Sequence, residues 1–141
     1  MIGAGGLGCR WARAAHSRVP SESDLMLVDA DIESFKGASN AHCMHLDPTG
    51  MEKGIAALPA LAAHRTISAL EEIDQVLTSA ELVVILTGLG GGTGTGSTIE
   101  LARASRQRGA IVVVVAGLPF AEQSFRACLL YTSDAADELL G

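Results

Sequence analysis

The fold is decided by the stretch Leu82-Val83-Val84-Ile85-Leu86-Thr87-Gly88-Leu89-Gly90-Gly91-Gly92-Thr93-Gly94-Thr95-Gly96-Ser97. Its first five residues are all apolar, which is typical of a strand buried on both faces of a parallel sheet. Glycine fills five of the seven positions from Gly90 to Gly96, so the backbone amides there can turn inward around anionic oxygens. A helix is expected from about Ser97 to Arg108. The stretch therefore predicts a strand, a phosphate-binding loop over 88–96 and a helix.

Hydroxyl groups add further donors to this loop. They belong to Thr93, Thr95 and Ser97, and the positive end of the following helix favours an anion at the same place. The spacing from Gly91 to Gly96 is that of a P-loop, but Ser97 stands where that motif needs a lysine. We therefore expect a phosphate cradle without a lysine. The alternative is a flexible linker, which is disfavoured because the glycines lie directly between an apolar strand and a helix.

A second glycine cluster stands at the N-terminus, as Gly3-Ala4-Gly5-Gly6-Leu7-Gly8. Asp29 and Asp31 follow the next apolar run, so the pattern matches the GxGxxG fingerprint of dinucleotide-binding proteins with its downstream acid. The alternative explanation is a tight turn between a strand and a helix, since that turn also favours glycine.

The remaining elements alternate between strand and helix. Helices are expected over 9–18 and 59–77, strands over 25–28 and 111–115, and mainly loop over 32–58. This order is typical of an α/β fold with three layers, a mostly parallel sheet and right-handed crossovers.

Composition narrows the class of protein. The chain has 141 residues, of which 48% are hydrophobic and 18% charged, enough for one domain and too apolar for general disorder. A net charge of −6 without a basic cluster excludes a general nucleic-acid binder. Three cysteines without a CxxC pair favour a reducing compartment. The apolar runs are too short for membrane insertion, so a cytoplasmic protein is expected.

Both ends of the chain suggest a piece of a longer protein. Met1 and Ile2 supply almost none of the strand that normally precedes a glycine turn. Residues 128–141 resemble a translated sequencing adapter, and the alternative is a short natural helix over 134–140. We therefore expect a nucleotide-binding domain over 1–127, incomplete at both ends, and a non-native tail over 128–141.

The loop 90–97 resembles the signature loop of the tubulin/FtsZ superfamily, which comprises GTPases that polymerise head to tail. The similarity extends in order from Ile2 to Ala127. Gly3 to Gly6 resemble the first glycine loop of the family, and Asp31 takes the place of the Asp in an Asn-Thr-Asp sequence. The resemblance implies a Rossmann-like GTP-binding domain of tubulin/FtsZ type.

The resemblance also implies a set of site residues. GTP or GDP, with Mg²⁺, would be bound by Gly5, Gly6, Asp31, Gly90, Gly91, Gly92, Thr93, Gly94, Thr95, Gly96, Glu122 and Arg126. In the family, an acidic loop of the neighbouring subunit completes hydrolysis, and this chain stops before that loop. No catalytic residue is therefore expected within it.

Some residues depart from the family pattern. Cys9, Arg10 and Trp11 occupy the stretch where FtsZ has an asparagine near the nucleotide, and Asp29 replaces the first Asn of Asn-Thr-Asp. Glu52 stands in a loop that is glycine-rich in FtsZ, where an acid would repel the γ-phosphate. These changes indicate a divergent FtsZ-like paralogue.

The leading interpretation is a GTP-binding, self-polymerising cytoskeletal protein that acts in prokaryotic cell division or cell shape. Its partners would be further copies of itself and division or membrane-tether proteins. One alternative is an FtsZ-like scaffold that no longer hydrolyses GTP. The other is an NAD(P)-binding oxidoreductase, which leaves the larger glycine loop without a role. His42, Cys43 and His45 are interpreted as a polar loop, so no metal site is expected.

Overall fold

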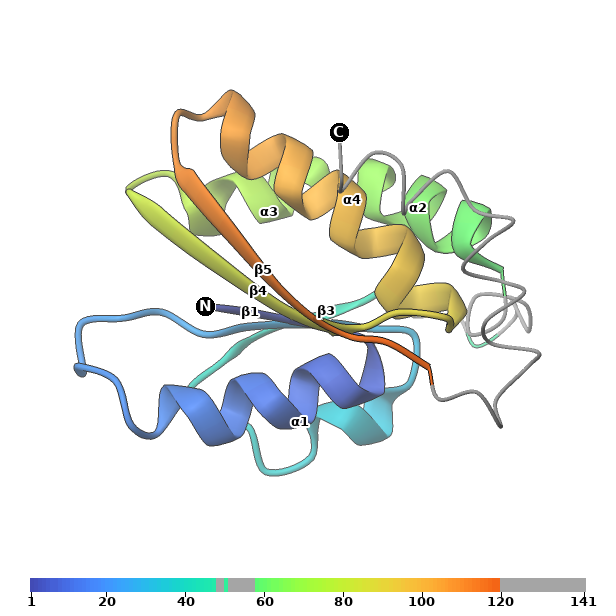
Figure 1. Cartoon of the computed structure of the whole chain (residues 1–141), viewed down its shortest axis with the longest axis horizontal. Coiled ribbons are helices and arrows are strands. Elements are labelled where there is room, and N and C mark those ends of the chain that lie inside the picture. The colour runs from blue at the N-terminus through green and yellow to red at the C-terminus, as the bar shows by residue number, and fades with distance from the viewer. Residues whose placement is uncertain (48–49, 51–57, 120–141) are drawn as a thin grey trace.

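The computed structural model describes residues 1–47, 50 and 58–119, and these form a parallel sheet between two layers of helices (Figure 1). The strand order is β3-β2-β1-β4-β5, and all four neighbouring pairs are parallel. The strands are β1 Ile2–Ala4, β2 Met26–Asp29, β3 His42–His45, β4 Leu82–Gly88 and β5 Ile111–Gly117.

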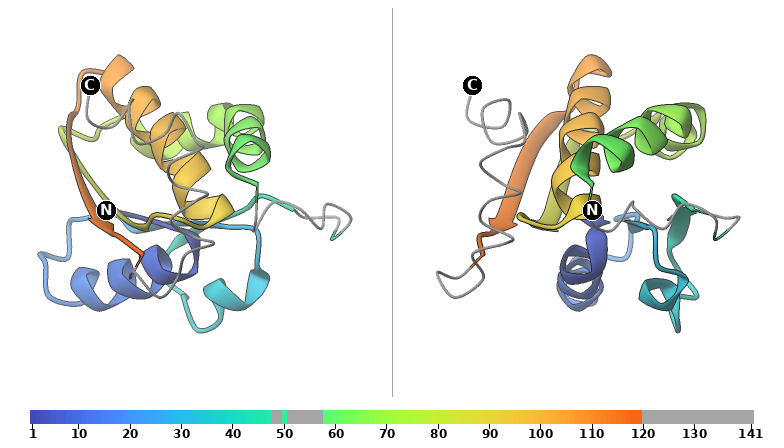
Figure 2. Two further views of the ribbon diagram at one scale, coloured as in Figure 1. Left: turned by 45° about the vertical axis from the view of Figure 1, so that its right-hand side comes forward. Right: turned by 90° about the vertical axis from the view of Figure 1, so that its right-hand side faces the viewer.

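The helices cover the two faces of the sheet unequally. One face carries α1 (Gly5–His16) and the short 3-10 helix η1 (Ile32–Phe35), and the other carries α2 (Pro59–Ser68), α3 (Leu70–Leu77) and α4 (Gly92–Gln107). Figure 2 shows the same separation from two further sides. The α/β class, the three layers and the parallel sheet predicted from the sequence are thus confirmed.

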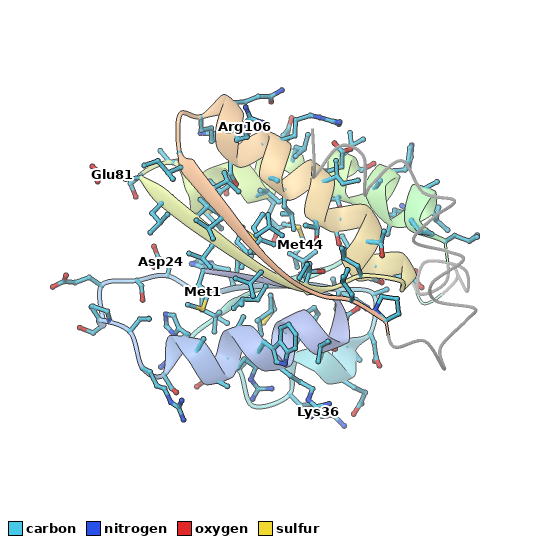
Figure 3. The ribbon with its side chains drawn as sticks, in the orientation of Figure 1. Met1, Asp24, Lys36, Met44, Glu81 and Arg106 are labelled. Atoms are coloured by element: carbon cyan, nitrogen blue, oxygen red, sulfur yellow. The ribbon has the colours of Figure 1, made fainter. Side chains whose placement is uncertain are left out.

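The larger apolar core lies between the sheet and the helices α2, α3 and α4. It contains Ile2, Met26, Ile85 and Leu101, all almost fully buried. Figure 3 shows Met44 between the sheet and this helix layer, whereas the charged side chains of Asp24, Lys36, Glu81 and Arg106 lie at the periphery. A smaller core under α1 contains Cys9, Ala12 and Leu27.

Both glycine segments enter a helix earlier than the sequence predicts. Helix α1 begins at Gly5 instead of residue 9, and α4 begins at Gly92 instead of Ser97. Glycine is a poor helix former, which is why these residues suggest loops. Close packing overrides that preference here: a Cβ atom at Gly8 would lie 2.2 Å from the Leu86 carbonyl oxygen. The helices approach the strand ends closely because these residues have no side chain.

Two further expectations are corrected. Residues 42–45, expected as part of a loop, form the edge strand β3, whose polar sequence carries no apolar run. The helix expected over 59–77 is divided at Ala69, where φ −98° and ψ 8° leave the helical region. Strand β2 is also displaced by one residue from the expected 25–28. The division into 1–127 and a tail over 128–141 stays a prediction, because the tail lies outside the described residues.

Across the described ranges, every helix is too short or too polar to span a lipid bilayer.

Candidate phosphate-binding site

The site lies where the strand order reverses. β1 is paired with β2 on one side and with β4 on the other, and Ala4 is the register partner of Thr87. Helix α1 leaves β1 towards one face of the sheet, and α4 leaves the end of β4 towards the other (Figure 1). In open α/β sheets, ligands bind at this kind of switch point, outside the carboxyl ends of the strands.

The two glycine segments meet at this point. A Cβ atom at Gly5 would lie 3.0 Å from the Gly94 nitrogen and 3.1 Å from its Cα atom, so the two backbones are in direct contact. Gly5 also has φ +75°, a left-handed conformation that favours glycine. Gly5 and Gly94, which are 89 residues apart in the sequence, therefore contribute to one site.

Both helices present an uncapped N-terminus here. Their N-cap residues, Ala4 and Gly91, make no side-chain cap hydrogen bond, and neither helix has an acidic residue in its first turn. Helices α2 and α3 also begin without a side-chain cap, and among the described helices only η1 has one, because the Asp31 carboxylate accepts from the Glu33 amide. The free amides and the helix dipoles at the switch point therefore favour an anion.

The glycines of the site fall into two groups. A Cβ atom at Gly94 would lie 2.4 Å from the Gly88 carbonyl oxygen, and one at Gly96 would lie 2.0 Å from that of Pro59, so both are required by packing. At Gly91 a Cβ atom would meet nothing within 4 Å, and at Gly6 only an Asp29 oxygen at 3.9 Å. Packing among the described residues does not explain the missing side chains of Gly6 and Gly91, whereas close approach of a ligand would.

The turn before α4 is held by backbone and hydroxyl groups. Gly90 has φ +92°, and its amide donates to the Thr95 hydroxyl at 2.9 Å. The Leu89 amide donates to the Gly117 carbonyl at 2.8 Å, which ties the turn to the end of β5. Gly92 is the buried first residue of α4. These bonds fix the loop without a ligand.

The hydroxyl groups expected to donate to phosphate are all buried. The Ser97 hydroxyl donates to the Thr93 carbonyl inside α4, so the structure gives it an internal partner. Thr95 is fully buried and holds Gly90, and Thr93 is 5% exposed. Binding by Thr93 and Thr95 stays a prediction, and the partly exposed residues of the loop 88–96 are the glycines Gly88 and Gly91.

Of the two acids after β2, the structure brings Asp29 against the first glycine segment. Asp29 is 5% exposed, accepts from the Ala30 amide at 2.8 Å, and also accepts from the Ser34 hydroxyl. Its second oxygen faces Gly6. Asp31, the acid chosen from the sequence, is exposed and caps η1, and its role towards a nucleotide stays a prediction.

Cys9 points into the protein. Its thiol donates to the Gly3 and Val28 carbonyls, and burial followed by the charge of Asp29 raises its pKa to about 12. Cys9 is therefore a neutral, buried thiol, and it does not take the ligand-facing place that an asparagine has in FtsZ.

Several predicted residues lie elsewhere. Glu122, Arg126 and Glu52 are outside the described residues, so their roles stay predictions. The His45 ring is paired with the Ala30 carbonyl at 2.8 Å on β3. In the part of the chain that the structure describes, no three histidine, cysteine or acidic side chains gather closely enough to hold a metal ion.

Sequence reasoning missed Thr87. Its hydroxyl is fully buried and lies between the two glycine segments, 3.3 Å from the Ala4 carbonyl oxygen and 3.1 Å from that of Gly94. The signal available in the sequence was a single polar residue at the end of an otherwise apolar strand.

Comparison with known proteins agrees with this geometry. The family model described as "Tubulin/FtsZ family, GTPase domain" matches residues 1–136. The cell division protein FtsZ of Haloferax mediterranei is 29% identical over 122 residues, which is 85% of this chain and 32% of that protein. FtsZ of Pseudomonas aeruginosa is 30% identical over 122 residues, with 85% and 31% covered.

Comparison with solved structures also finds similarity to FtsZ. An empty FtsZ dimer of M. jannaschii superposes with a TM-score of 0.82 at 26% identity, covering 98% of this chain and 40% of that one. CetZ from Methanosaeta thermophila, at 22% identity and a TM-score of 0.77, shares the fold. The chain spans about a third of the length of the curated relatives it matches.

Proposed function

The chain belongs to the tubulin/FtsZ family, whose GTPase domain matches residues 1–136, and from this premise we propose that it binds GTP or GDP through their phosphates at the switch point. The phosphates lie on the free amides at the start of α4, from Gly91 to Gly94, with further contacts from Gly5 and Gly6. Glu122 and Arg126 hold the ribose side, as the family resemblance implies.

One observation carries this proposal above the others. Two uncapped helix N-termini from opposite faces of the sheet are in backbone contact at Gly5 and Gly94. A chain of phosphoryl groups carries negative charge along its whole length, so it can use both positive ends at once. The open space beside Gly6 and Gly91 supports the same placement.

The proposal extends to the protein of which this domain is a part. Mg²⁺ accompanies the triphosphate, because it neutralises the phosphate charge that Asp29 and Asp31 would otherwise repel. The protein assembles head to tail with copies of itself in the cytoplasm and serves in cell division or cell shape. The FtsZ names of its relatives and the dimer among the similar structures support this part.

The test is a competition between nucleotides on the purified 141-residue chain. A fluorescent GTP analogue is bound with Mg²⁺ present, and unlabelled GTP, GDP and NADH are titrated against it while anisotropy is recorded. We expect GTP and GDP to displace the analogue at much lower concentrations than NADH. Displacement by NADH alone would refute the proposal and restore the oxidoreductase alternative.

The NAD(P) alternative has one structural point in its favour, namely Asp29 beside Gly6 at the end of β2. In dinucleotide-binding proteins an acid at this place bonds to the ribose hydroxyls. Here both carboxylate oxygens already accept internal hydrogen bonds, from the Ala30 amide and the Ser34 hydroxyl. These bonds hold the carboxylate in place, and the match of residues 1–136 to the tubulin/FtsZ GTPase domain favours GTP.

A further inference from the structure

The Thr87 side chain lies between the two halves of the phosphate site. It ends the apolar part of β4, is the register partner of Ala4 in β1, and is fully buried. Ala4 is the residue before α1, and Gly94 is in the first turn of α4. The Thr87 hydroxyl is within hydrogen-bond distance of both carbonyl oxygens, at 3.3 and 3.1 Å.

The fit between Thr87 and Gly94 is close. A Cβ atom at Gly94 would lie 2.9 Å from the Thr87 Oγ1 atom, so the hydroxyl occupies the space beside the missing side chain of Gly94. This hydroxyl therefore contacts the backbone where Gly5 and Gly94 meet. The hydroxyl has one proton, which the two carbonyl oxygens share, so this bifurcated hydrogen bond is sensitive to a shift of α4 away from β1.

Neither carbonyl depends on Thr87 for a partner. The carbonyl of an N-cap residue such as Ala4 accepts the first hydrogen bond within its helix, and the Gly94 carbonyl accepts from the Thr98 hydroxyl at 2.5 Å. The Thr87 bond is thus additional to what each helix needs for itself. Its distinct effect is to connect two elements that lie on opposite faces of the sheet.

We propose that Thr87 is a positioning residue, which fixes the N-termini of α1 and α4 at the separation that lets one polyphosphate engage both. The proposal rests on the function proposed above and deepens it, since it names a ligand class of at least two linked phosphoryl groups. A single phosphate reaches one helix end and gains nothing from the fixed separation. A tripolyphosphate reaches both helix ends. Once it is bound to one of them, its contact with the other forms within the same complex and adds to the affinity.

The chain offers a matched control in Thr98. Its hydroxyl is also fully buried and donates to the same Gly94 carbonyl, but it lies within α4 and connects nothing to β1. Removing either hydroxyl costs a comparable internal hydrogen bond. Only the Thr87 change releases α4 from the end of β1.

The experiment measures the affinity of the 141-residue chain for orthophosphate and for tripolyphosphate by calorimetry, without divalent cations. Thr87→Val and Thr87→Ala remove the hydroxyl, Thr87→Ser keeps it, and Thr98→Val is the control. Valine places a methyl group where the oxygen is 3.1 Å from a carbonyl, so the smaller alanine guards against a variant that fails to fold. Thermal unfolding of each variant is recorded alongside.

We expect the wild type, Thr87→Ser and Thr98→Val to bind tripolyphosphate more tightly than orthophosphate. In Thr87→Val and Thr87→Ala this preference falls by a factor on the order of ten, while orthophosphate affinity is unchanged. An unchanged preference in both folded variants, or an equal loss in Thr98→Val, would overturn the role of Thr87 and leave the proposed function intact. A wild type that binds no tripolyphosphate would overturn both.

Discussion

Gly91 is the N-cap of α4 and Gly94 lies in its first turn, yet alanine at Gly94 should lower stability whereas alanine at Gly91 should lower binding. At Gly94 the new Cβ atom would lie 2.4 Å from the Gly88 carbonyl oxygen, far inside van der Waals contact, and that oxygen belongs to a paired strand end. Overpacking of this kind typically costs about 1–3 kcal/mol. The Tm of Gly94→Ala should therefore fall by an amount on the order of 5–15 °C.

At Gly91 the new Cβ atom meets nothing within 4 Å, and φ −102° with ψ 168° is an extended conformation that alanine adopts freely. Alanine is a weaker N-cap than glycine, which lowers the free energy of unfolding. It also reduces the conformational entropy of the unfolded chain, which raises the free energy of unfolding by about 0.4–1 kcal/mol, so the two effects largely cancel. The Tm should stay within about 3 °C of the wild type. Tripolyphosphate should bind at least about tenfold more weakly, a loss of about 1.4 kcal/mol, because the methyl group enters the space of the anion.

The assay pairs thermal unfolding with calorimetric titration of tripolyphosphate, and Gly6→Ala serves as a second open position. If Gly91→Ala binds like the wild type, the phosphate does not lie beside Gly91. If its Tm falls as far as that of Gly94→Ala, a Cβ atom at Gly91 collides with a neighbouring group and the space beside Gly91 is not open.

Three further outcomes follow from the charges and thiols of the chain. At pH 8, a maleimide should label the exposed Cys43 far faster than Cys9, because Cys9 is buried and its pKa is raised to about 12. Peptide mass spectrometry measures the labelling of each cysteine separately, and equal rates would contradict the burial of Cys9. The hydrogen bond from Arg108 lowers the pKa of Asp74, so Arg108→Gln should lower the Tm slightly at pH 7. This difference in Tm should disappear as the pH falls below about 4 and Asp74 is protonated, and a difference that persists at pH 2 would contradict the ion pair. Without Mg²⁺, Asp29→Asn should bind tripolyphosphate several-fold more tightly, because it removes a buried negative charge beside the site, whereas weaker binding in calorimetry would mean that the carboxylate contacts the ligand.

The elements that the sequence predicts well are those with a continuous apolar or β-branched run. The run from Leu82 to Leu86 forms the mostly buried strand β4, and the β-branched run from Ile111 forms β5, an edge strand in which Ile111, Val113 and Val115 are exposed. β3 lies at the opposite edge of the sheet, and it gives no such pattern because two of its four residues are histidines and its first two, His42 and Cys43, are exposed. Its pairing with β2 depends on tertiary contacts that local composition does not reveal.

The candidate site also depends on tertiary contacts that local composition does not reveal. Glycine content located the loop, but the start of α4 depends on how closely Gly94 and Gly96 pack against Gly88 and Pro59, which lie in other elements. The resemblance to the Asn-Thr-Asp sequence selects Asp31, whereas the packing of α1 against β2 brings the Asp29 carboxylate to Gly6. Thr87 carries no motif at all, and its position between two carbonyls appears only once β1 and β4 are paired.

The division of the glycines into two groups also bears on whether the chain is a nucleotide binder or a scaffold that has kept only the fold. A scaffold still needs Gly94 and Gly96, because any side chain there would collide with a carbonyl oxygen. It has no need of glycine at Gly91 or Gly6, where a Cβ atom fits without collision and alanine would favour the helix of which Gly6 is a part. This chain has glycine at all four positions. The two that packing does not require are the two that face open space at the switch point, and a ligand approaching the backbone there gives them a physical reason. These two glycines favour a domain that still binds its nucleotide, and the Gly91→Ala titration decides between that domain and a scaffold.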